Sequence, residues 1–262
     1  MFQFCSLFSG SSGNCSLVQT NSTKILIDAG ESTKKICDAL TSIQIDPTCI
    51  DAILITHEHS DHVKGLGTFS KKFNIPVYAN KETWDAMKSQ REKIEEKNIN
   101  YFSFDKFSIK DLDINPFSIP HDAANPCGFN IYHNNKKISI ATDIGHINKE
   151  IIDNLKNSSF LLLEANYEPE VLKCSSYPYL LKERIKGPTG HLSNLDAGKT
   201  ISYLTNHGLN NVMLGHLSKE NNFPELAYKT VVEELMQNNL TENSIKLSVA
   251  KRYEASPFID VV

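Results

Sequence analysis

Short apolar runs bounded by polar residues alternate with longer mixed segments along this chain. Runs of this length predict buried β-strands, and the five clearest cover residues 24–27, 52–56, 138–142, 160–163 and 212–215. Each run is followed at once by a carboxylate or an imidazole, namely Asp28, His57, Asp143, Glu164 and His216. Polar residues end many strands, but strand ends are also where α/β proteins collect ligand-binding groups. Five repeats of the pattern favour the second interpretation.

The segments between these runs predict helices. Residues 81–97 are rich in charge and predict one exposed helix. Ser193 is a suitable N-cap for a helix that continues to about His207. Residues 225–237 form a further amphipathic segment. Since strands and helices alternate without an internal repeat or an obvious linker, we predict a single α/β domain over residues 1–262.

Composition narrows the classes of protein to which the chain can belong. With 40% hydrophobic and 22% charged residues, it is typical of a soluble globular protein. The six cysteines form no CxxC pair, the N-terminus lacks export features, and no apolar run reaches membrane-spanning length. We therefore expect a cytoplasmic protein that does not enter a membrane. The net charge of −4 argues against a strongly basic nucleic-acid binder. It does not argue against a nuclease, because bound dications supply local positive charge.

The segment THEHSDH, at residues 56–62, carries the spacing HxHxDH. With nine histidines among 262 residues, such a cluster would rarely arise by chance. Imidazole and carboxylate groups suit zinc, manganese and iron. A closed structural zinc site needs only four ligands, which this segment alone supplies as His57, His59, Asp61 and His62. Because further candidate ligands follow other strands, we predict an open site for two divalent ions that activate water for hydrolysis.

This segment resembles the signature of the metallo-β-lactamase superfamily of hydrolases, and the similarity covers most of the chain. The superfamily's first, third, fourth and fifth motifs are similar to the surroundings of Asp28, His121, Asp143 and His216. The resemblance implies an αββα sandwich, in which two packed sheets lie between outer helices and two metal ions lie at one edge. It also implies the ligands. One ion would be held by His57, His59 and His121, the other by Asp61, His62 and His216, and both by Asp143. Asp28 would orient one of these ligands by a hydrogen bond, without binding an ion itself.

A second group of residues is expected beside the metals. His191 stands in Gly190-His191-Leu192-Ser193-Asn194, where it could face a phosphate near a helix N-terminus. It resembles a histidine that assists the leaving group in ribonuclease Z-like enzymes, and Glu164 stands where the partner of that histidine is expected. We therefore predict a catalytic role for Asp143, Glu164 and His191, and substrate contacts from Ser193 and Asn194. The alternative is that His191 merely caps the loop.

Two further segments are candidates for substrate binding. The glycine-rich stretch at residues 9–15 suits close approach of the backbone to a ligand, which predicts contacts from Ser11, Ser12 and Asn14. A plain hairpin turn is the alternative. Between Glu164 and His191, cationic and aromatic side chains alternate, which fits the phosphates and unpaired bases of a nucleic acid. A solvated helix face explains the same pattern equally well. These side chains are Lys173, Tyr177, Tyr179, Lys182, Arg184 and Lys186.

Five segments, namely SGSSGNC, THEHSDH, the loop around His121, GHLSN and GHLSKENN, together resemble the WalJ (YycJ, VicX) group of bacterial metallo-hydrolases. That group is associated with 5′-to-3′ exonuclease action on DNA and is encoded beside a cell-wall-regulating two-component system. The resemblance implies a phosphodiesterase with two divalent ions, zinc or manganese ahead of iron, and DNA as the substrate. Two alternatives stay open. One is a phosphodiesterase for small cyclic or diester phosphates, and the other is a metal-binding accessory protein of the signalling pathway.

Overall fold

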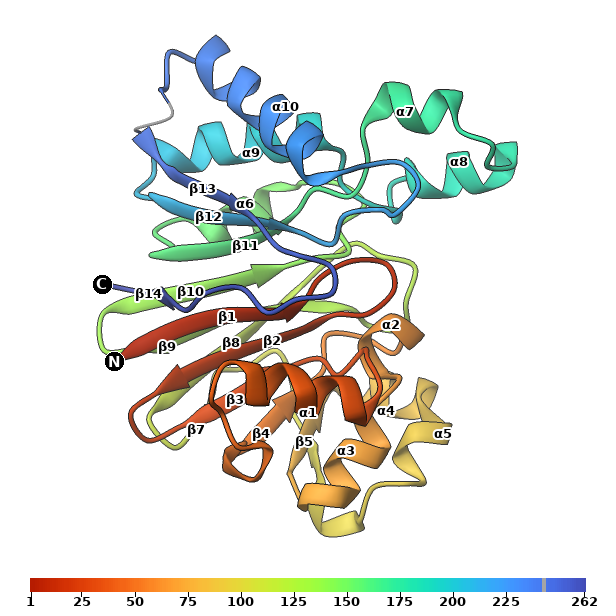
Figure 1. The fold of residues 1–262 in the computed structure, drawn as a ribbon, viewed down its shortest axis with the longest axis vertical. Helices are drawn as coiled ribbons and strands as arrows, with labels where there is room; N and C mark the ends of the chain where they lie inside the picture. Colours follow the sequence, from red (N-terminus) through yellow and green to blue (C-terminus); the bar gives the residue numbers. More distant parts are fainter. Residues whose placement is uncertain (242–243) are drawn as a thin grey trace.

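The computed structural model describes residues 1–241 and 244–262 and contains two facing seven-stranded sheets (Figure 1). The first sheet has the order β14-β1-β2-β3-β4-β5-β6, with strands β1 (Phe2–Phe8), β2 (Cys15–Thr20), β3 (Lys24–Ile27), β4 (Ala52–Leu54), β5 (Val77–Ala79), β6 (Ile99–Tyr101) and β14 (Ile259–Asp260). The second has the order β13-β12-β11-β10-β9-β8-β7, with strands β7 (Phe107–Ile109), β8 (Leu112–Ser118), β9 (Cys127–His133), β10 (Lys136–Ala141), β11 (Phe160–Glu164), β12 (Asn211–Gly215) and β13 (Lys246–Val249). Each half of the chain thus builds one sheet, and only the last strand returns to the first.

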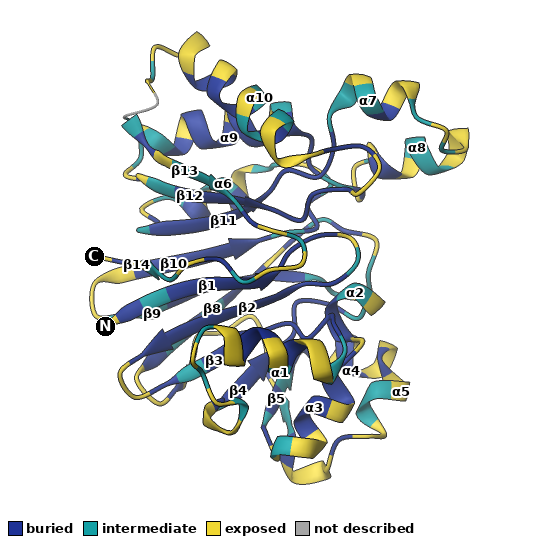
Figure 2. Ribbon diagram, viewed as in Figure 1, coloured by how far each residue is buried: buried dark blue, intermediate teal, exposed yellow. Residues whose placement is uncertain are grey.

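Strands β3 and β11 are apolar apart from one end residue each, because both faces of their sheets are buried. In β3, Ile25 and Ile27 pack between the two sheets, whereas Leu26 packs under the helices of the first half. In β11, Phe160 and Leu162 lie between the sheets, and the alternate leucines face the helices of the second half. The molecule therefore has three apolar layers, one between the sheets and one beneath each set of helices (Figure 2).

Helices cover the outer face of each sheet and turn their exposed residues to solvent (Figure 2). The first half contributes α1 (Thr33–Ser42), α2 (Ser60–Val63), α3 (Leu66–Phe73), α4 (Lys81–Ala86) and α5 (Lys88–Arg91), with short 3₁₀ turns η1 (Pro47–Cys49) and η2 (Glu96–Asn98). The second contributes α6 (Lys149–Leu155), α7 (Pro169–Cys174), α8 (Tyr179–Ile185), α9 (Asn194–Thr205) and α10 (Pro224–Gln237). Of the helices in residues 1–241 and 244–262, none is long and apolar enough to cross a membrane.

The predicted αββα sandwich is confirmed, as are the five strands and the helices near 193–207 and 225–237. The single exposed helix expected over residues 81–97 is wrong. The chain leaves helical geometry at Met87 and again after Arg91, so that α4, α5 and η2 replace one continuous helix. Trp84, Met87 and Ile94 are all buried in the core of the first half. Burial of these three apolar side chains outweighs the helix preference of the charged residues around them.

Candidate metal centre

Strands from both sheets deliver the predicted side chains to one edge of the sandwich. Asp28 follows β3, Asp143 lies just beyond β10, Glu164 ends β11, and His216 follows β12. Asp28, Asp143 and His216 adopt left-handed backbone conformations, with φ of 63°, 59° and 54°. Such a conformation costs a non-glycine residue on the order of 1 kcal/mol or more, so it persists only where its surroundings hold it. Three of them at one edge mark a site at which backbone strain aims side chains inward.

The HxHxDH segment leaves β4 and enters the short helix α2, with His59 at its N-cap. Ligand atoms within 4.8 Å of one another fall into overlapping groups. One contains His57, His59 and His121, and another contains Asp61, His62 and His216. Asp143 joins His57 and His62 in a third, and Asp143, Glu164, His191 and His216 form a fourth. The structure thus brings together the residues of both predicted ion sites, and Asp143 lies between them.

A fixed group holds the Nδ1 atom of four of these histidines. Nδ1 of His57 lies 3.0 Å from Thr56 Oγ1, that of His62 lies 2.8 Å from Asp28 Oδ2, and that of His121 lies 3.0 Å from the carbonyl oxygen of Gly190. Nδ1 of His216 lies 2.8 Å from Glu164 Oε1. Metal-binding histidines characteristically donate their second N–H to such partners, which fixes the tautomer and the ring orientation. In each case Nε2 is the nitrogen left for an ion.

The donor set fits divalent metal ions. His57 Nε2 is buried and has no hydrogen-bond partner among the described residues. A buried polar atom without a partner is costly, so this nitrogen needs a ligand that the protein chain does not supply. Asp143 Oδ2 is also buried and lies 3.2 Å from His62 Nε2, so one ion could contact both atoms. His62 and His216 each lie within 3.5 Å of Asp61 Oδ2, close enough to share an ion with it. Imidazole nitrogens and carboxylate oxygens in this proportion are ligands of zinc, manganese and iron.

Glu164 organises the second half of the site. Oε2 accepts the backbone N–H groups of Ile144 (2.7 Å) and Leu192 (2.9 Å), and Oε1 lies 2.9 Å from Nδ1 of His191 as well as 2.8 Å from that of His216. Burial raises the pKa of Glu164, but the charges of the two imidazoles outweigh it and lower that pKa to about 2. Burial likewise lowers the pKa of His216, and Asp143, Asp61 and Glu164 outweigh it, raising the pKa to about 10. The anionic charge around these imidazoles makes the site one for cations.

The comparison with known families agrees with this geometry. Residues 23–217 match the family described as the beta-lactamase superfamily domain. The chain belongs to the beta-lactamase superfamily. Exodeoxyribonuclease WalJ of Streptococcus pneumoniae is 39% identical to it over 242 residues, covering 91% of this chain and 90% of that protein. Exodeoxyribonuclease YycJ of Bacillus anthracis is 35% identical over 233 residues, covering 88% of each. The superfamily fold recurs in the metallo-beta-lactamase fold protein YhfI of Bacillus subtilis, with a TM-score of 0.70, 16% identity, and coverage of 98% of this chain and 99% of that one.

The predicted substrate contacts of this superfamily member divide into two groups. Asn14 lies inside the centre, with Nδ2 3.1 Å from His62 Nε2, while Ser11 is exposed and Ser12 partly buried on the same loop. Ser193 instead caps α9, accepting the N–H of Asp196 and donating to its carboxylate. Asn194 is fully buried and bonds to Glu168 and Asn222. The structure therefore gives these last two residues structural partners, and a role in substrate binding stays a prediction.

The cations predicted between Glu164 and His191 lie on α7, on α8 and just beyond it. Each has a partner within the chain: Lys173 with Glu170, Lys182 with the carbonyl oxygens of Lys173 and Ser175, Arg184 with Asp122, and Lys186 with Glu183. Tyr179, the first residue of α8, is 71% exposed. Because each charge is already paired, the arrangement favours the interpretation as a solvated helix face over that of a preformed nucleic-acid surface.

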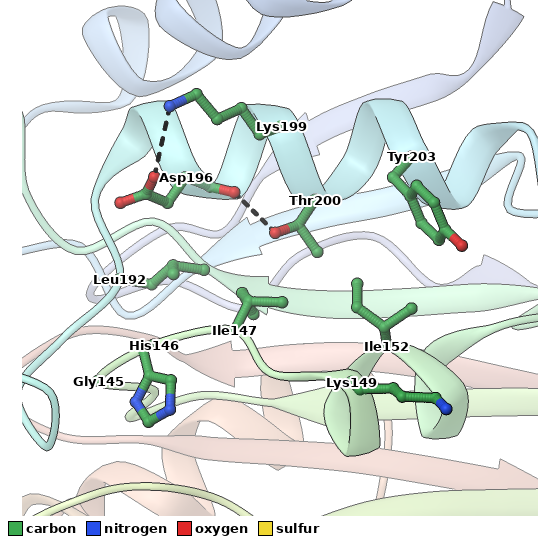
Figure 3. A pocket seen from close by; sticks show the side chains of 10 residues that line it. All are labelled: Gly145, His146, Ile147, Lys149, Ile152, Leu192, Asp196, Lys199, Thr200 and Tyr203. Atoms are coloured by element: carbon green, nitrogen blue, oxygen red, sulfur yellow. Dashed lines mark hydrogen bonds and ion pairs between the residues drawn. The ribbon is translucent and has the colours of Figure 1, made fainter.

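A cavity of about 580 Å³ opens between α6 and α9, beside the loops that carry Asp143 and His191 (Figure 3). Lys149 and Lys199 lie on opposite walls, Ile152 and Leu192 supply apolar surface, and Tyr203 lies at the end away from His146. His146, three residues after Asp143, bonds through Nδ1 to the carbonyl oxygen of Pro188 (2.8 Å). Asp196 also lines the cavity and pairs with Lys199 (3.7 Å), so the cavity combines mixed charge with apolar surface.

Two residues of the site were missed from the sequence. The Thr56 hydroxyl lies within 3.3 Å of Asp28, His57 and His62, and so links three members of the centre. Ser9 Oγ accepts the N–H of His216 (2.8 Å). Thr56 could have been found from its place directly before the cluster. No local pattern connects Ser9 to His216, because 207 residues separate them.

Proposed function

We propose that the protein is a 5′-to-3′ exodeoxyribonuclease that uses two divalent ions to hydrolyse phosphodiester bonds of DNA. The observation that carries the proposal is the pair of ligand groups joined through Asp143, with His191 and Glu164 beside them. Two adjacent ions suit phosphodiester hydrolysis because both the attacking and the departing oxygen need charge stabilisation. The two exodeoxyribonucleases that match about nine-tenths of the chain support DNA as the substrate.

The chain's own residues divide the work. His57, His59 and His121 would hold one ion, Asp61, His62 and His216 the other, and Asp143 would contact both. When bound, the ions lower the pKa of a water molecule and neutralise phosphate charge. Zinc or manganese fits the mixture of imidazole and carboxylate best, and iron is the third candidate.

His191 is the residue we assign to the leaving oxygen. Glu164 accepts a hydrogen bond from its Nδ1 atom, so the imidazole is held in one orientation with Nε2 directed away from the carboxylate. Its side chain keeps 20% exposure, whereas that of Glu164 has none, so the imidazole is the member of the pair that a substrate can reach. In this arrangement Nε2 donates a hydrogen bond or a proton to the oxygen that departs, and Glu164 stabilises the charged imidazole from behind.

The test begins with metal analysis of the purified protein, followed by digestion with that metal restored. Three substrates are compared: a 5′-phosphorylated DNA duplex labelled at the 3′ end, an RNA duplex of the same sequence, and a chromogenic phosphodiester. We expect progressive shortening of the DNA from its 5′ end. Cleavage of the chromogenic diester alone would instead identify a small-molecule phosphodiesterase. A fully metallated protein that cleaves none of the three would identify an accessory protein.

A further inference from the structure

The loop at residues 9–14, between β1 and β2, is fastened to the metal centre at both ends. At one end Ser9 Oγ accepts the N–H of His216 (2.8 Å). At the other, Asn14 Nδ2 lies 3.1 Å from His62 Nε2, and Asn14 Oδ1 accepts the N–H of Gly10 (3.0 Å). The loop is therefore fixed relative to the second group of predicted ligands, and anything that it binds lies next to the ions.

This loop carries hydrogen-bond donors that the chain leaves unused. The backbone N–H groups of Ser11 and Ser12 have no acceptor within the described part of the chain. The Ser12 hydroxyl is buried and likewise lacks a partner there. Ser11 is exposed at the tip. Successive free N–H groups in a turn form a concave surface that accepts anions.

Arg252 reaches the same loop from the far end of the sequence, where the chain passes from β13 to β14 beside the β1–β2 loop (Figure 1). Its Nη2 donates to the carbonyl oxygen of Leu217 (2.5 Å), and Nη1 is buried without an acceptor among the described residues. Gly10 has φ +150°, and a Cβ there would come within 2.3 Å of Nη1. Only glycine therefore lets the loop lie directly on the guanidinium group.

The Arg252 guanidinium is a partly buried charge without a counter-ion. Burial lowers the pKa of Arg252, and the charges of Tyr253 and Glu220 raise it to a smaller extent, without an ion pair to a carboxylate among the described residues. An arginine whose charge is buried without a partner is costly, and its planar set of N–H groups matches phosphate oxygens. An anion that arrives from outside would supply the missing partner.

We propose that Arg252, together with Ser11 and Ser12, binds a phosphate of the DNA strand adjacent to the phosphate that is cleaved. The inference rests on the proposed function for its substrate and adds a site that determines which bond is presented to the ions. The bound group can be the terminal 5′-phosphate or an internal phosphate, and the chemistry of recognition is the same for both. In either case this contact would position the DNA strand, so that the neighbouring phosphate lies at the ions.

Kinetics of Arg252→Gln test the site, with Arg252→Lys as the conservative variant and Lys251→Gln as the control. Lys251 is an exposed neighbour that pairs with Glu254 (2.6 Å), so its loss removes the same charge from the same segment. For Arg252→Gln we expect the ratio of kcat/KM on DNA to kcat/KM on a chromogenic diester to fall at least tenfold, mainly through KM. Arg252→Lys should recover part of the loss, and Lys251→Gln should show none. An equal fall on both substrates, or no fall on either, would overturn the assignment.

The source of the phosphate follows from the same variants. If the loss appears on 5′-phosphorylated DNA and not on 5′-hydroxyl DNA, Arg252 binds the terminal phosphate; an equal loss on both identifies an internal one. Binding of a cleavage-resistant phosphorothioate oligonucleotide, followed by fluorescence anisotropy, gives a readout that does not need turnover. We expect Arg252→Gln to weaken this binding at least tenfold relative to Lys251→Gln. Unchanged binding by Arg252→Gln would refute the Arg252 site even if the protein digests DNA. If the unaltered protein does not digest DNA, that result would refute only the proposed function.

Discussion

Substitution of Glu164 by glutamine would disturb four hydrogen bonds with a change of one atom. The carboxylate accepts N–H groups of Ile144 and Leu192 through Oε2, and of His191 and His216 through Oε1. A carboxamide keeps one acceptor and replaces the other by an NH₂ group. Whichever way the amide is turned, two of the four donors then face another donor.

The size of the effect follows from this geometry. Each lost hydrogen bond to a charged, buried acceptor is worth about 1.5–3 kcal/mol. Because the bonds share one carboxylate and are not additive, we take the lower end for the pair, roughly 3 kcal/mol. For a chain of this size, that corresponds to a decrease in Tm of about 6–12 °C. His216 can reduce the loss by changing tautomer, but its Nε2 then carries the proton and can no longer bind an ion.

Two measurements separate a loss of stability from a loss of ion binding, namely thermal unfolding of the metal-free protein and metal content after reloading. We expect Glu164→Gln to lower the Tm, or to lower the metal content at a preserved Tm, and to reduce turnover in both cases. Glu183→Gln is the matched control, since among the described residues that carboxylate forms an ion pair with Lys186 alone, at the surface of α8. A variant with unchanged Tm, full metal content and full turnover would refute the role of Glu164 as the common acceptor.

Further substitutions separate metal binding, catalysis and capping. His59→Ala or Asp61→Asn should remove both bound metal and turnover, and activity that survives either change contradicts the ligand assignment. His191→Ala should retain metal but lose about 10²–10⁴-fold in kcat, with His133→Ala as a histidine control; a loss of metal would make His191 a ligand instead. Ser193→Ala should cost about 1 kcal/mol of stability as a lost helix cap while KM on DNA stays the same, and a raised KM would support the predicted substrate contact.

Much of the site was predictable because its side chains follow strands directly. Asp28, His57, Asp143, Glu164 and His216 each stand within one or two residues of an apolar run, so a local pattern placed them at a common edge. The partner of His191 was predictable only through the resemblance to ribonuclease Z-like enzymes, in which an upstream glutamate pairs with the comparable histidine.

The contacts that were not predictable join distant segments or depend on burial. Glu164 bonds to His216 as well as to His191, a shared acceptor that no spacing in the sequence reveals. Arg252 meets Gly10 across nearly the whole chain. The prediction of one helix over residues 81–97 was wrong for a related reason. Trp84 and Met87 are buried in the core, and a local count of charged residues does not reveal that burial.

The division of the predicted ligands between the two sheets has a consequence for assembly. His57, His59, Asp61 and His62 come from the half of the chain that builds the first sheet, while His121, Asp143 and His216 come from the half that builds the second. Ions bound here would cross-link the two sheets at the edge where the ligands lie, and so would stabilise the folded protein. The ion sites are complete only when the two sheets have packed in the correct register, so metal binding would select the correctly folded enzyme.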